Sequence, residues 1–402
     1  MNILITNLNN TYNYGSMMMG ENLITYLKNK ISDCNFYIDA LTEEHTDRLK
    51  QACMYENIYL DSIFKIHLIT NKIKGVRRFE RKIKDALAYN KCKKFYDVIF
   101  ILGGDDFSEI YYKIPEETNL VFKALKHIEN LNKSSKLYMI GQTIGPYTDE
   151  RLTYAKEVFN EIKIYSRDET SKEYLEKNNI NVEVSRDLAF LNLNLQSKKL
   201  ENKVLMEYNL EKEGYIVIVG TGLFENYTKN QKNMLKSFET IIKKIKDKYP
   251  DKKIVWLSHV LNCNATDNRM LEKINKNLFD IIIERPILPV EARMILGNGY
   301  LTITCRMHAA VSTFQMGRPA ICISYSQKYN GVIARGLKMK KLVIEAKDDK
   351  IWNNKIVKEV INRTEYIDDN YDEIKNNIKK EVSKCQKQVN NMLEKIVKEI
   401  EN

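Results

Sequence analysis

Short apolar runs alternate along the chain with longer segments in which apolar residues recur every three or four positions. Residues 97–102 (DVIFIL) are apolar at almost every position, which is typical of a strand buried on both faces of a parallel sheet. Residues 16–30 carry Met19, Leu23, Ile24 and Leu27 at helical spacing after a first short strand. Because this alternation continues through both halves, we expect an α/β fold with two doubly wound, Rossmann-like domains facing a cleft.

The alternation pauses at residues 191–203 (LNLNLQSKKLENK), which we interpret as a linker. The sequence therefore predicts an N-terminal α/β domain over residues 1–195 and a second over residues 196–345. A helical tail follows over residues 346–402. Residues 371–402 place apolar side chains three or four positions apart between Lys and Glu, which predicts one long amphipathic helix.

Composition describes a folded globular protein, with 44% hydrophobic and 29% charged residues in a chain of 402. Seven cysteines without a CxxC pair argue against a disulfide framework and a structural zinc site. The N-terminus has no basic region followed by an apolar run, and no window approaches the roughly 20 apolar residues of a membrane span. We expect a cytoplasmic protein.

The net charge of +11 favours anionic partners. Residues 76–94 are the most basic segment, and their apolar residues recur at helical spacing. Two interpretations stay open for this segment: contact with an anionic membrane surface or acceptor, and a solvated helix packed on the core by its apolar residues.

The strongest chemical pattern lies in residues 300–328, where an apolar strand ends at Arg306 and His308 before a segment of small residues. In open α/β sheets, ligands bind at the carboxyl ends of the strands. Arginine suits forked binding of carboxylate or phosphate, and histidine exchanges protons near neutral pH. This corner therefore predicts a site for a small anion with proton transfer. His259, at the end of another expected strand, is a less favoured candidate.

Other expected strand ends carry further candidates. After the strand at residues 97–102, Gly103 and Gly104 let the backbone turn close to a ligand, and Asp105 and Asp106 can accept hydrogen bonds from sugar hydroxyls or act as a base. Arg167 and Lys328 add two cations near strand ends.

The turn before the first helix is a candidate anion loop, because Asn13 and Gly15 can offer backbone N–H groups at the helix start. The chain lacks the dinucleotide GxGxxG fingerprint, the Walker A motif and the GxSxG serine elbow. It also lacks recognisable nucleic-acid-binding motifs, so no nucleic acid partner is expected.

Several short motifs, spread in order over residues 1–345, resemble those of the polysaccharide pyruvyl transferases. The motifs that carry the resemblance are Asn13-Tyr14-Gly15, Gly103-Gly104-Asp105, Gly141-Gln142-Thr143-Ile144-Gly145-Pro146, Ser166-Arg167-Asp168-Glu169, Asp187-Leu188-Ala189-Phe190, Arg306-Met307-His308-Ala309, Gly317-Arg318-Pro319 and the segment from Tyr325 to Lys328. Two positions depart from the family pattern: Met307 stands for a leucine and Leu188 for a proline. Neither removes a polar group.

The resemblance implies a glycosyltransferase-B-like pair of domains and a reaction without a cofactor. Phosphoenolpyruvate would be the donor, and its pyruvyl group would pass as a ketal to two hydroxyls of a sugar in a cell-surface polysaccharide or its precursor, releasing phosphate. The resemblance also implies that the N-terminal domain binds the acceptor and the C-terminal domain binds the donor.

Residue roles follow from the same resemblance. Arg306, His308 and Arg167 take the positions of the family's donor-gripping motifs, and Gln142 belongs to a substrate-binding motif. We assign His308 as the general acid, Asp105 or Asp106 as the base, and Lys328 to neutralising the donor. No metal is expected.

Several partner questions stay open at this point: a free or lipid-linked sugar acceptor, a peripheral position at the inner face of the membrane, and homo-oligomerisation. Two other functions also stay open. One is a nucleotide-sugar glycosyltransferase of the same architecture, and the other is a non-catalytic module that binds anionic glycan or lipid.

Overall fold

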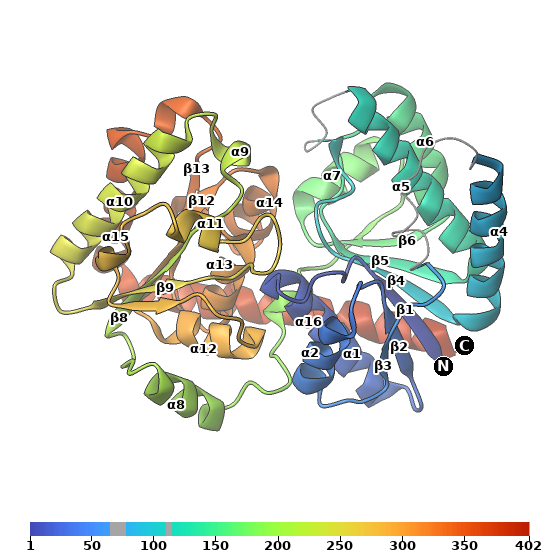
Figure 1. Ribbon diagram of the computed structural model, residues 1–402, viewed down its shortest axis with the longest axis horizontal. Helices are drawn as coiled ribbons and strands as arrows, with labels where there is room; N and C mark the ends of the chain where they lie inside the picture. The colour runs from blue at the N-terminus through green and yellow to red at the C-terminus, as the bar shows by residue number, and fades with distance from the viewer. Residues whose placement is uncertain (65–77, 110–114, 402) are drawn as a thin grey trace. The chain divides into compact units, whose positions relative to one another are not determined.

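The computed structural model describes residues 1–64, 78–109 and 115–401, and within these it describes only the backbone of residues 78–85 and 115–119 (Figure 1). The described chain forms two compact units. Unit 1 comprises residues 1–11, 19–188 and 388–402, and unit 2 comprises residues 12–18 and 189–387. The sequence placed the first boundary at residue 195 and set residues 346–402 apart as a tail, whereas contacts assign residues 346–387 to unit 2 and the remainder to unit 1.

Unit 1 is built on a parallel sheet in the order β3-β2-β1-β4-β5-β6-β7. The strands are β1 (Asn2–Thr6), β2 (Asn35–Ile38), β3 (Ile58–Leu60), β4 (Val98–Leu102), β5 (Lys136–Gln142), β6 (Lys163–Ser166) and β7 (Glu183–Val184). Every residue of β4 is buried, as its unbroken apolar pattern predicted. Because the strand order reverses between β1 and β4, the carboxyl ends of these two strands mark the crevice where such sheets bind ligands.

Helices cover the sheet of unit 1, and α4, α5 and α6 pack side by side (Figure 1). Their bounds are α1 (Tyr14–Lys30), α2 (Glu43–Cys53), α4 (Arg78–Phe95), α5 (Pro115–Ser134), α6 (Asp149–Phe159) and α7 (Glu169–Lys177). The core between helices and sheet includes Ile99, Ile101, Leu125 and Phe159. The basic segment expected over residues 76–94 falls largely on α4, but its first two residues lie outside the described residues.

Unit 2 repeats the scheme with a parallel sheet in the order β10-β9-β8-β11-β12-β13. The strands are β8 (Tyr215–Val219), β9 (Lys253–Leu257), β10 (Ile281–Ile283), β11 (Leu301–Thr304), β12 (Ala320–Ser324) and β13 (Val343–Glu345). The helices are α8 (Lys198–Glu207), α9 (Phe224–Tyr227), α10 (Gln231–Lys248), α11 (Asn268–Leu271), α12 (Pro289–Asn298), α13 (Met307–Gln315), α14 (Gln327–Tyr329) and α15 (Asn354–Asp369). Short helical turns, of which η5 is a π-helix and the others 3₁₀, are η3 (Leu188–Phe190), η4 (Lys276–Leu278), η5 (Asn330–Arg335), η6 (Lys340–Leu342) and η7 (Asp349–Ile351).

The linker prediction for residues 191–203 was wrong in its second half, where α8 begins. Ser197 caps this helix by accepting a hydrogen bond from the backbone N–H of Leu200, and Val204 and Leu205 are buried. A serine followed by apolar residues at helical spacing was the local indication of this helix.

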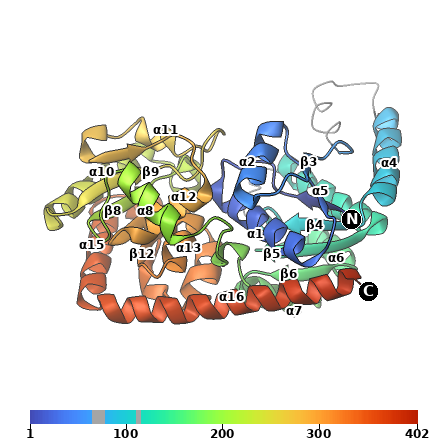
Figure 2. The same cartoon turned by 90° about the horizontal axis from the view of Figure 1, so that it is seen from below.

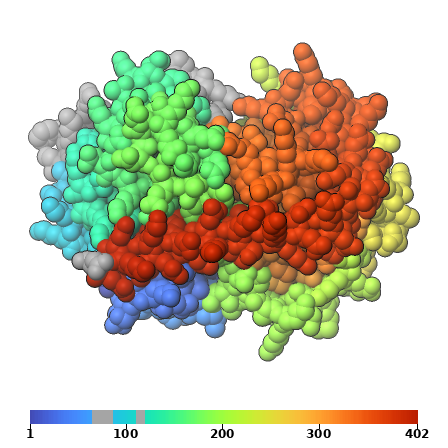
Figure 3. All heavy atoms as spheres, turned by 180° about the vertical axis from the view of Figure 1, so that it is seen from behind, coloured from blue at the N-terminus to red at the C-terminus, as the bar shows by residue number. Residues whose placement is uncertain are grey.

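The long C-terminal helix was predicted correctly as α16 (Tyr371–Glu401), which runs unbroken for 31 residues (Figure 2). Its apolar stripe, including Ile378, Val382 and Val389, is buried, while the Lys residues between these positions are exposed. Figure 3 shows in red the outer face of this C-terminal segment. Residues of α16 up to Lys387 belong to unit 2 and those from Gln388 to unit 1. Among the described residues, we find no helix with the length and hydropathy needed to cross a membrane.

Candidate functional site

The corner predicted at Arg306 and His308 lies in unit 2, where β11 ends and α13 begins. Arg306 is the N-cap residue of α13 in an extended conformation, and its backbone N–H donates to Oγ1 of Thr304 at 2.8 Å. The small residues Ala309 and Ala310 are fully buried, so α13 packs closely against the sheet. The strand-to-helix turn therefore fixes Arg306 at the carboxyl end of β11.

A buried carboxylate orients Arg306. Nε of Arg306 donates to Oδ1 of Asp267 at 2.8 Å, and a terminal nitrogen donates to the carbonyl of Ala265 at 2.5 Å. The other oxygen of Asp267 accepts the backbone N–H groups of His259 and Val260 at 2.8 and 2.9 Å. Burial lowers the pKa of Arg306, but Asp267 outweighs it and raises that pKa above its ordinary value, so the guanidinium stays charged.

The N-terminal turn of α1 belongs to unit 2 and lies against His308. A Cβ atom at Gly15 would overlap the imidazole ring, so only glycine leaves room for His308 in this position. Asn13 forms an isolated antiparallel bridge with Val260, and the backbone N–H of Tyr14 donates to the carbonyl of His259 at 3.2 Å. The predicted anion loop is thus anchored beside the predicted proton-transfer residue.

Two helix N-termini, those of α1 and α13, meet at His308. Neither helix has an acidic residue in its first turn, so the partial positive charge of both ends is uncompensated by their own side chains. With Arg306 beside them, these helix ends form an electropositive corner suited to an anion.

His259 packs beneath this corner as a neutral side chain. Its ring contacts Tyr14 edge-to-face with centroids 5.3 Å apart, and it is buried. Burial lowers its pKa well below the ordinary value, and His308 and Arg306 lower it further. His259 therefore supports the corner without adding charge.

Lys328 lies on α14, just beyond β12. Its Nζ donates to the hydroxyl of Tyr325 at 2.8 Å and sits 4.8 Å from the centre of that ring. Tyr227 and Tyr329 lie below and both donate to the carbonyl of Cys305, at 2.8 and 2.6 Å. This tyrosine cluster positions Lys328 on the same sheet edge as Arg306.

Arg167 lies in unit 1 and is 1% exposed. Its Nε donates to Oγ1 of Thr143 at 2.9 Å, and a terminal nitrogen pairs with Asp187 at 3.1 Å. Burial lowers the pKa of Arg167, but Asp187, followed by Asp105 and Asp168, raises it above its ordinary value. The structure thus brings Arg167 and Asp105 together inside unit 1, and the predicted contact of Arg167 with a donor stays a prediction.

The loop after β4 approaches the end of β5 closely, as the predicted Gly103 requires. A Cβ atom at Gly103 would overlap the carbonyl of Gly141, and one at Gly104 would meet the carboxylate of Asp106. Gln142 is fully buried and donates to the carbonyl groups of Ile101 and Leu102 at 3.2 and 2.7 Å. Gln142 therefore braces β4 and β5 behind the loop.

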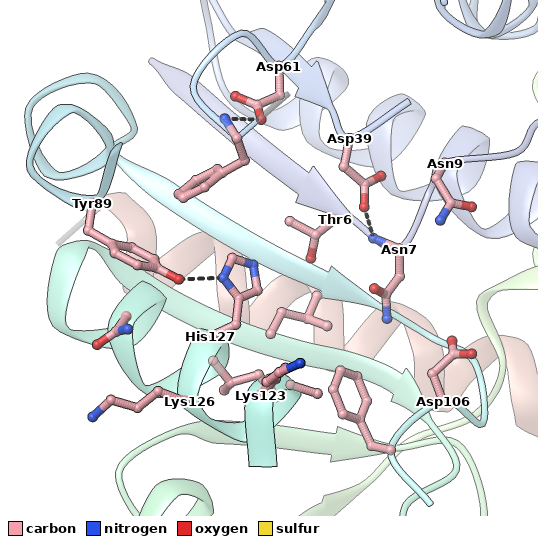
Figure 4. Close-up of a pocket in the computed structure, with 16 residues that line it drawn as sticks. Thr6, Asn7, Asn9, Asp39, Asp61, Tyr89, Asp106, Lys123, Lys126 and His127 are labelled. Carbon is pink, nitrogen blue, oxygen red and sulfur yellow. Dashed lines mark hydrogen bonds between the residues drawn. The ribbon is translucent and has the colours of Figure 1, made fainter. Parts of the chain in front are cut away.

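A pocket of about 510 Å³ lies in unit 1 at the carboxyl ends of the first four strands (Figure 4). Asp106 lines it, together with Asn7, Asp39, Asp61 and His127, none of which the sequence indicated as site residues. We find no group of three or more His, Cys, Asp and Glu side chains placed to hold a metal ion in the described ranges.

Sequence reasoning also missed Asp267 and Tyr14 as parts of the unit 2 corner. Asp267 is 39 positions from Arg306 and lies in an irregular loop, so no local periodicity links the two. Tyr14 stood within the predicted anion loop, and its hydroxyl accepts the backbone N–H of Ile287 at 2.9 Å.

Solved structures with this architecture include nucleotide-sugar enzymes. A UDP-GlcNAc 2-epimerase from Neisseria meningitidis, solved with bound UDP-GlcNAc, is 14% identical, has a TM-score of 0.66 and aligns over 99% of this chain and 100% of its own. A glycosyltransferase from Rickettsia africae is 12% identical with a TM-score of 0.59, over 99% and 98% of the two chains. The fold of this chain is therefore the glycosyltransferase-B-like class with two α/β units.

Within that class, a family model described as polysaccharide pyruvyl transferase matches residues 13–327. The chain belongs to the polysaccharide pyruvyl transferase family, as its motifs indicated. The amylovoran biosynthesis protein AmsJ of Erwinia amylovora is 24% identical over 259 residues, which cover 60% of this chain and 59% of that protein. The chain thus matches less than two thirds of that relative's length.

Proposed function

We propose that this chain transfers the pyruvyl group of phosphoenolpyruvate to two hydroxyls of a sugar, forming a cyclic ketal and releasing inorganic phosphate. The observation that carries the proposal is the unit 2 corner, where Arg306 and His308 of the family motif stand at two helix N-termini. Phosphoenolpyruvate carries a carboxylate and a phosphate, and both are anions that arginine and helix N-termini bind well.

The proposed reaction starts with His308 donating a proton to the methylene carbon of the donor. One sugar hydroxyl then attacks the cationic C2 carbon and loses its proton, which gives a phosphorylated ketal. The C2–O bond to phosphate breaks, phosphate leaves, and the second sugar hydroxyl attacks C2 and loses its proton. Of the two protons lost, one replaces that given by His308, and the other leaves with phosphate or solvent.

Each residue of the corner has a part in this scheme. Arg306, held by Asp267 and Ala265, offers a fixed positive charge to the donor, and Lys328 supplies a second charge on the same sheet edge. Gly15 leaves the space that His308 occupies. Asp105 and Asp106 stay the proposed bases for the acceptor hydroxyls.

The direct test measures phosphate release from phosphoenolpyruvate with a panel of p-nitrophenyl hexosides and N-acetylhexosaminides, and the mass gain of the acceptor. We expect turnover in the wild type and at least a hundredfold loss in His308→Gln, because the amide keeps the shape but cannot donate a proton in this way. His45→Gln is the matched control, since His45 lies on α2 in unit 1 and bonds to Thr11.

The donor itself is tested by thermal stabilisation. We expect phosphoenolpyruvate, but not UDP-sugars, to raise the Tm, with the shift lost in Arg306→Met. Stabilisation and turnover with a nucleotide sugar would instead establish a glycosyltransferase. Salt-sensitive glycan binding without turnover of any donor would establish a binding module.

A further inference from the structure

The pocket of unit 1 lies at the strand ends where the sheet order reverses. The residues that line it from the sheet lie at strand ends. Thr6 is the last residue of β1 and Asn7 follows it, while Asp39, Asp61 and Asp106 come after β2, β3 and β4. Figure 4 shows the polar side chains of these strand ends on one side of the pocket and those of α5 on the other. A volume of about 510 Å³ falls within the range of pockets that bury small molecules.

Asn7 presents a buried donor to this pocket. Its side-chain Nδ2 is inaccessible to solvent and has no hydrogen-bond partner among the described residues. A buried amide nitrogen without a partner is costly unless a ligand or water supplies an acceptor. The backbone of Asn7 has φ of +63°, the left-handed conformation that asparagine adopts more readily than most non-glycine residues.

Asp39 holds the loop in this conformation. Its two carboxylate oxygens accept the backbone N–H groups of Asn7 at 2.7 Å and Leu8 at 2.9 Å. Each oxygen can accept one more hydrogen bond, because a carboxylate has about four acceptor positions. Asp39 and Asn7 thus line the pocket with an acceptor and a donor for sugar hydroxyls.

The opposite wall comes from one face of α5. Lys123, His127 and Asn130 are three or four residues apart and line the pocket. Nδ1 of His127 is 2.6 Å from the hydroxyl of Tyr89, and Phe64 contacts the imidazole edge-to-face with centroids 5.5 Å apart. Aromatic and apolar surface beside amide and carboxylate groups matches the two faces of a sugar ring.

The carboxylates argue against a phosphate as the principal ligand. Asp39, Asp61 and Asp106 all line the strand-end side. Asp61 is occupied by the N–H groups of Ile63 and Phe64 and by the hydroxyl of Tyr96. A neutral polyol can bond to such a wall, whereas an anion there would be repelled.

We infer that this pocket binds the saccharide acceptor, with Asn7 donating to a sugar oxygen and Asp39 accepting from a sugar hydroxyl. The identity of the ligand as the acceptor rests on the proposed function. Saccharide binding to the pocket stands on the geometry of unit 1.

Replacing Asn7 with glycine separates ligand binding by its side chain from a role in shaping the loop. Asn7→Gly removes the amide but suits a positive φ, so the loop keeps its conformation. Asn179→Gly is the matched control, because Asn179 also has a positive φ, of 57°, and lies exposed beyond α7, away from the pocket. A second pair of variants tests the space in the pocket. Ala124→Trp fills the pocket from the lining face of α5, and Leu120→Trp is its exposed control on the same helix.

Saccharide binding is measured without donor, by saturation-transfer NMR on the full chain with the p-nitrophenyl glycoside panel. We expect binding to be lost in Ala124→Trp and weakened about tenfold in Asn7→Gly, with both controls like the wild type. With turnover, the same variants should raise the acceptor KM and leave the phosphoenolpyruvate KM unchanged.

Two outcomes overturn the inference: no glycoside of the panel binds the wild type, or binding and acceptor KM are unchanged in Asn7→Gly and Ala124→Trp. If these variants lose glycoside binding but the wild type neither binds nor turns over phosphoenolpyruvate, saccharide binding in the pocket is supported and the proposed function is wrong. If the protein turns over phosphoenolpyruvate but the acceptor KM is the same in both variants as in the wild type, the proposed function stands and the pocket inference is wrong.

Discussion

The two units carry the same kind of parallel sheet, and each has an arginine paired with a buried aspartate at its strand ends. In unit 2 the Arg306 side chain is 11% exposed and pairs with Asp267, whereas in unit 1 Arg167 is 1% exposed and pairs with Asp187. The first arginine is the N-cap residue of α13 and lies two positions from His308, while the second is enclosed by Thr143 and carboxylates. The surroundings of a strand-end arginine therefore decide how much of its side chain a ligand could reach.

The largest expected effect comes from breaking the buried pair of unit 1. Asp187→Ala leaves the enclosed charge of Arg167 without its partner, so we expect the free energy of unfolding to fall by about 3–5 kcal/mol. Urea unfolding measures this loss. The double variant Arg167→Met with Asp187→Leu should recover at least half of it, and a loss below about 1 kcal/mol in the single variant would contradict the brace role.

A large functional effect is expected at Gly15 in unit 2. Gly15→Ala forces His308 out of its position, so we expect phosphoenolpyruvate turnover to fall about a hundredfold while the fold persists. Phosphate release and circular dichroism check both parts. Gly214→Ala is the control, since its nearest contact, the carbonyl of Glu211 at 3.2 Å, lies outside the corner. Unchanged turnover in Gly15→Ala would remove His308 from the mechanism.

An intermediate effect is expected from the pH dependence of unit 1. Burial raises the pKa of Asp39 to about 6, although the N–H groups of Asn7 and Leu8 lower it. The folded state holds the proton of Asp39 more tightly than the unfolded state does. The contribution of Asp39 to the free energy of unfolding is therefore greatest below about pH 4. It falls as the pH rises towards 6, by about 1–3 kcal/mol.

Asp39→Asn isolates that contribution, because asparagine does not titrate. Urea unfolding of both proteins at pH 4.5 and 7.5 gives the difference. We expect the wild type to lose more stability than Asp39→Asn over this interval. Equal losses would show that Asp39 ionises normally in the folded protein.

The smallest expected effect is at Lys328. Lys328→Met keeps most of the packing on Tyr325 but removes the charge, so we expect the phosphoenolpyruvate KM to rise about fivefold. Steady-state kinetics at two salt concentrations measures it. An unchanged KM at low salt would leave Arg306 and the helix ends as the donor's partners.

Much of the fold could be predicted because its determinants are local. Unbroken apolar strands such as β4, the helical spacing in α16, and glycines at close backbone approaches are all visible in a few neighbouring residues. Family membership also followed from motifs in order. The helix α8 was missed because its Ser197 cap stood inside a polar segment that resembled a linker.

Most of the site's geometry could not be predicted, because it depends on partners far apart in sequence. By itself the sequence determined the alternation of strands and helices, the place of Arg306 and His308 at a strand end, and the family. Only the tertiary structure decided that Asp267 orients Arg306, that Gly15 packs on His308, and that Asp39 holds Asn7 at a pocket. The reason is physical: periodicity records which face of an element is buried, whereas pairing between loops follows from strand order, which brings distant strand ends to one edge.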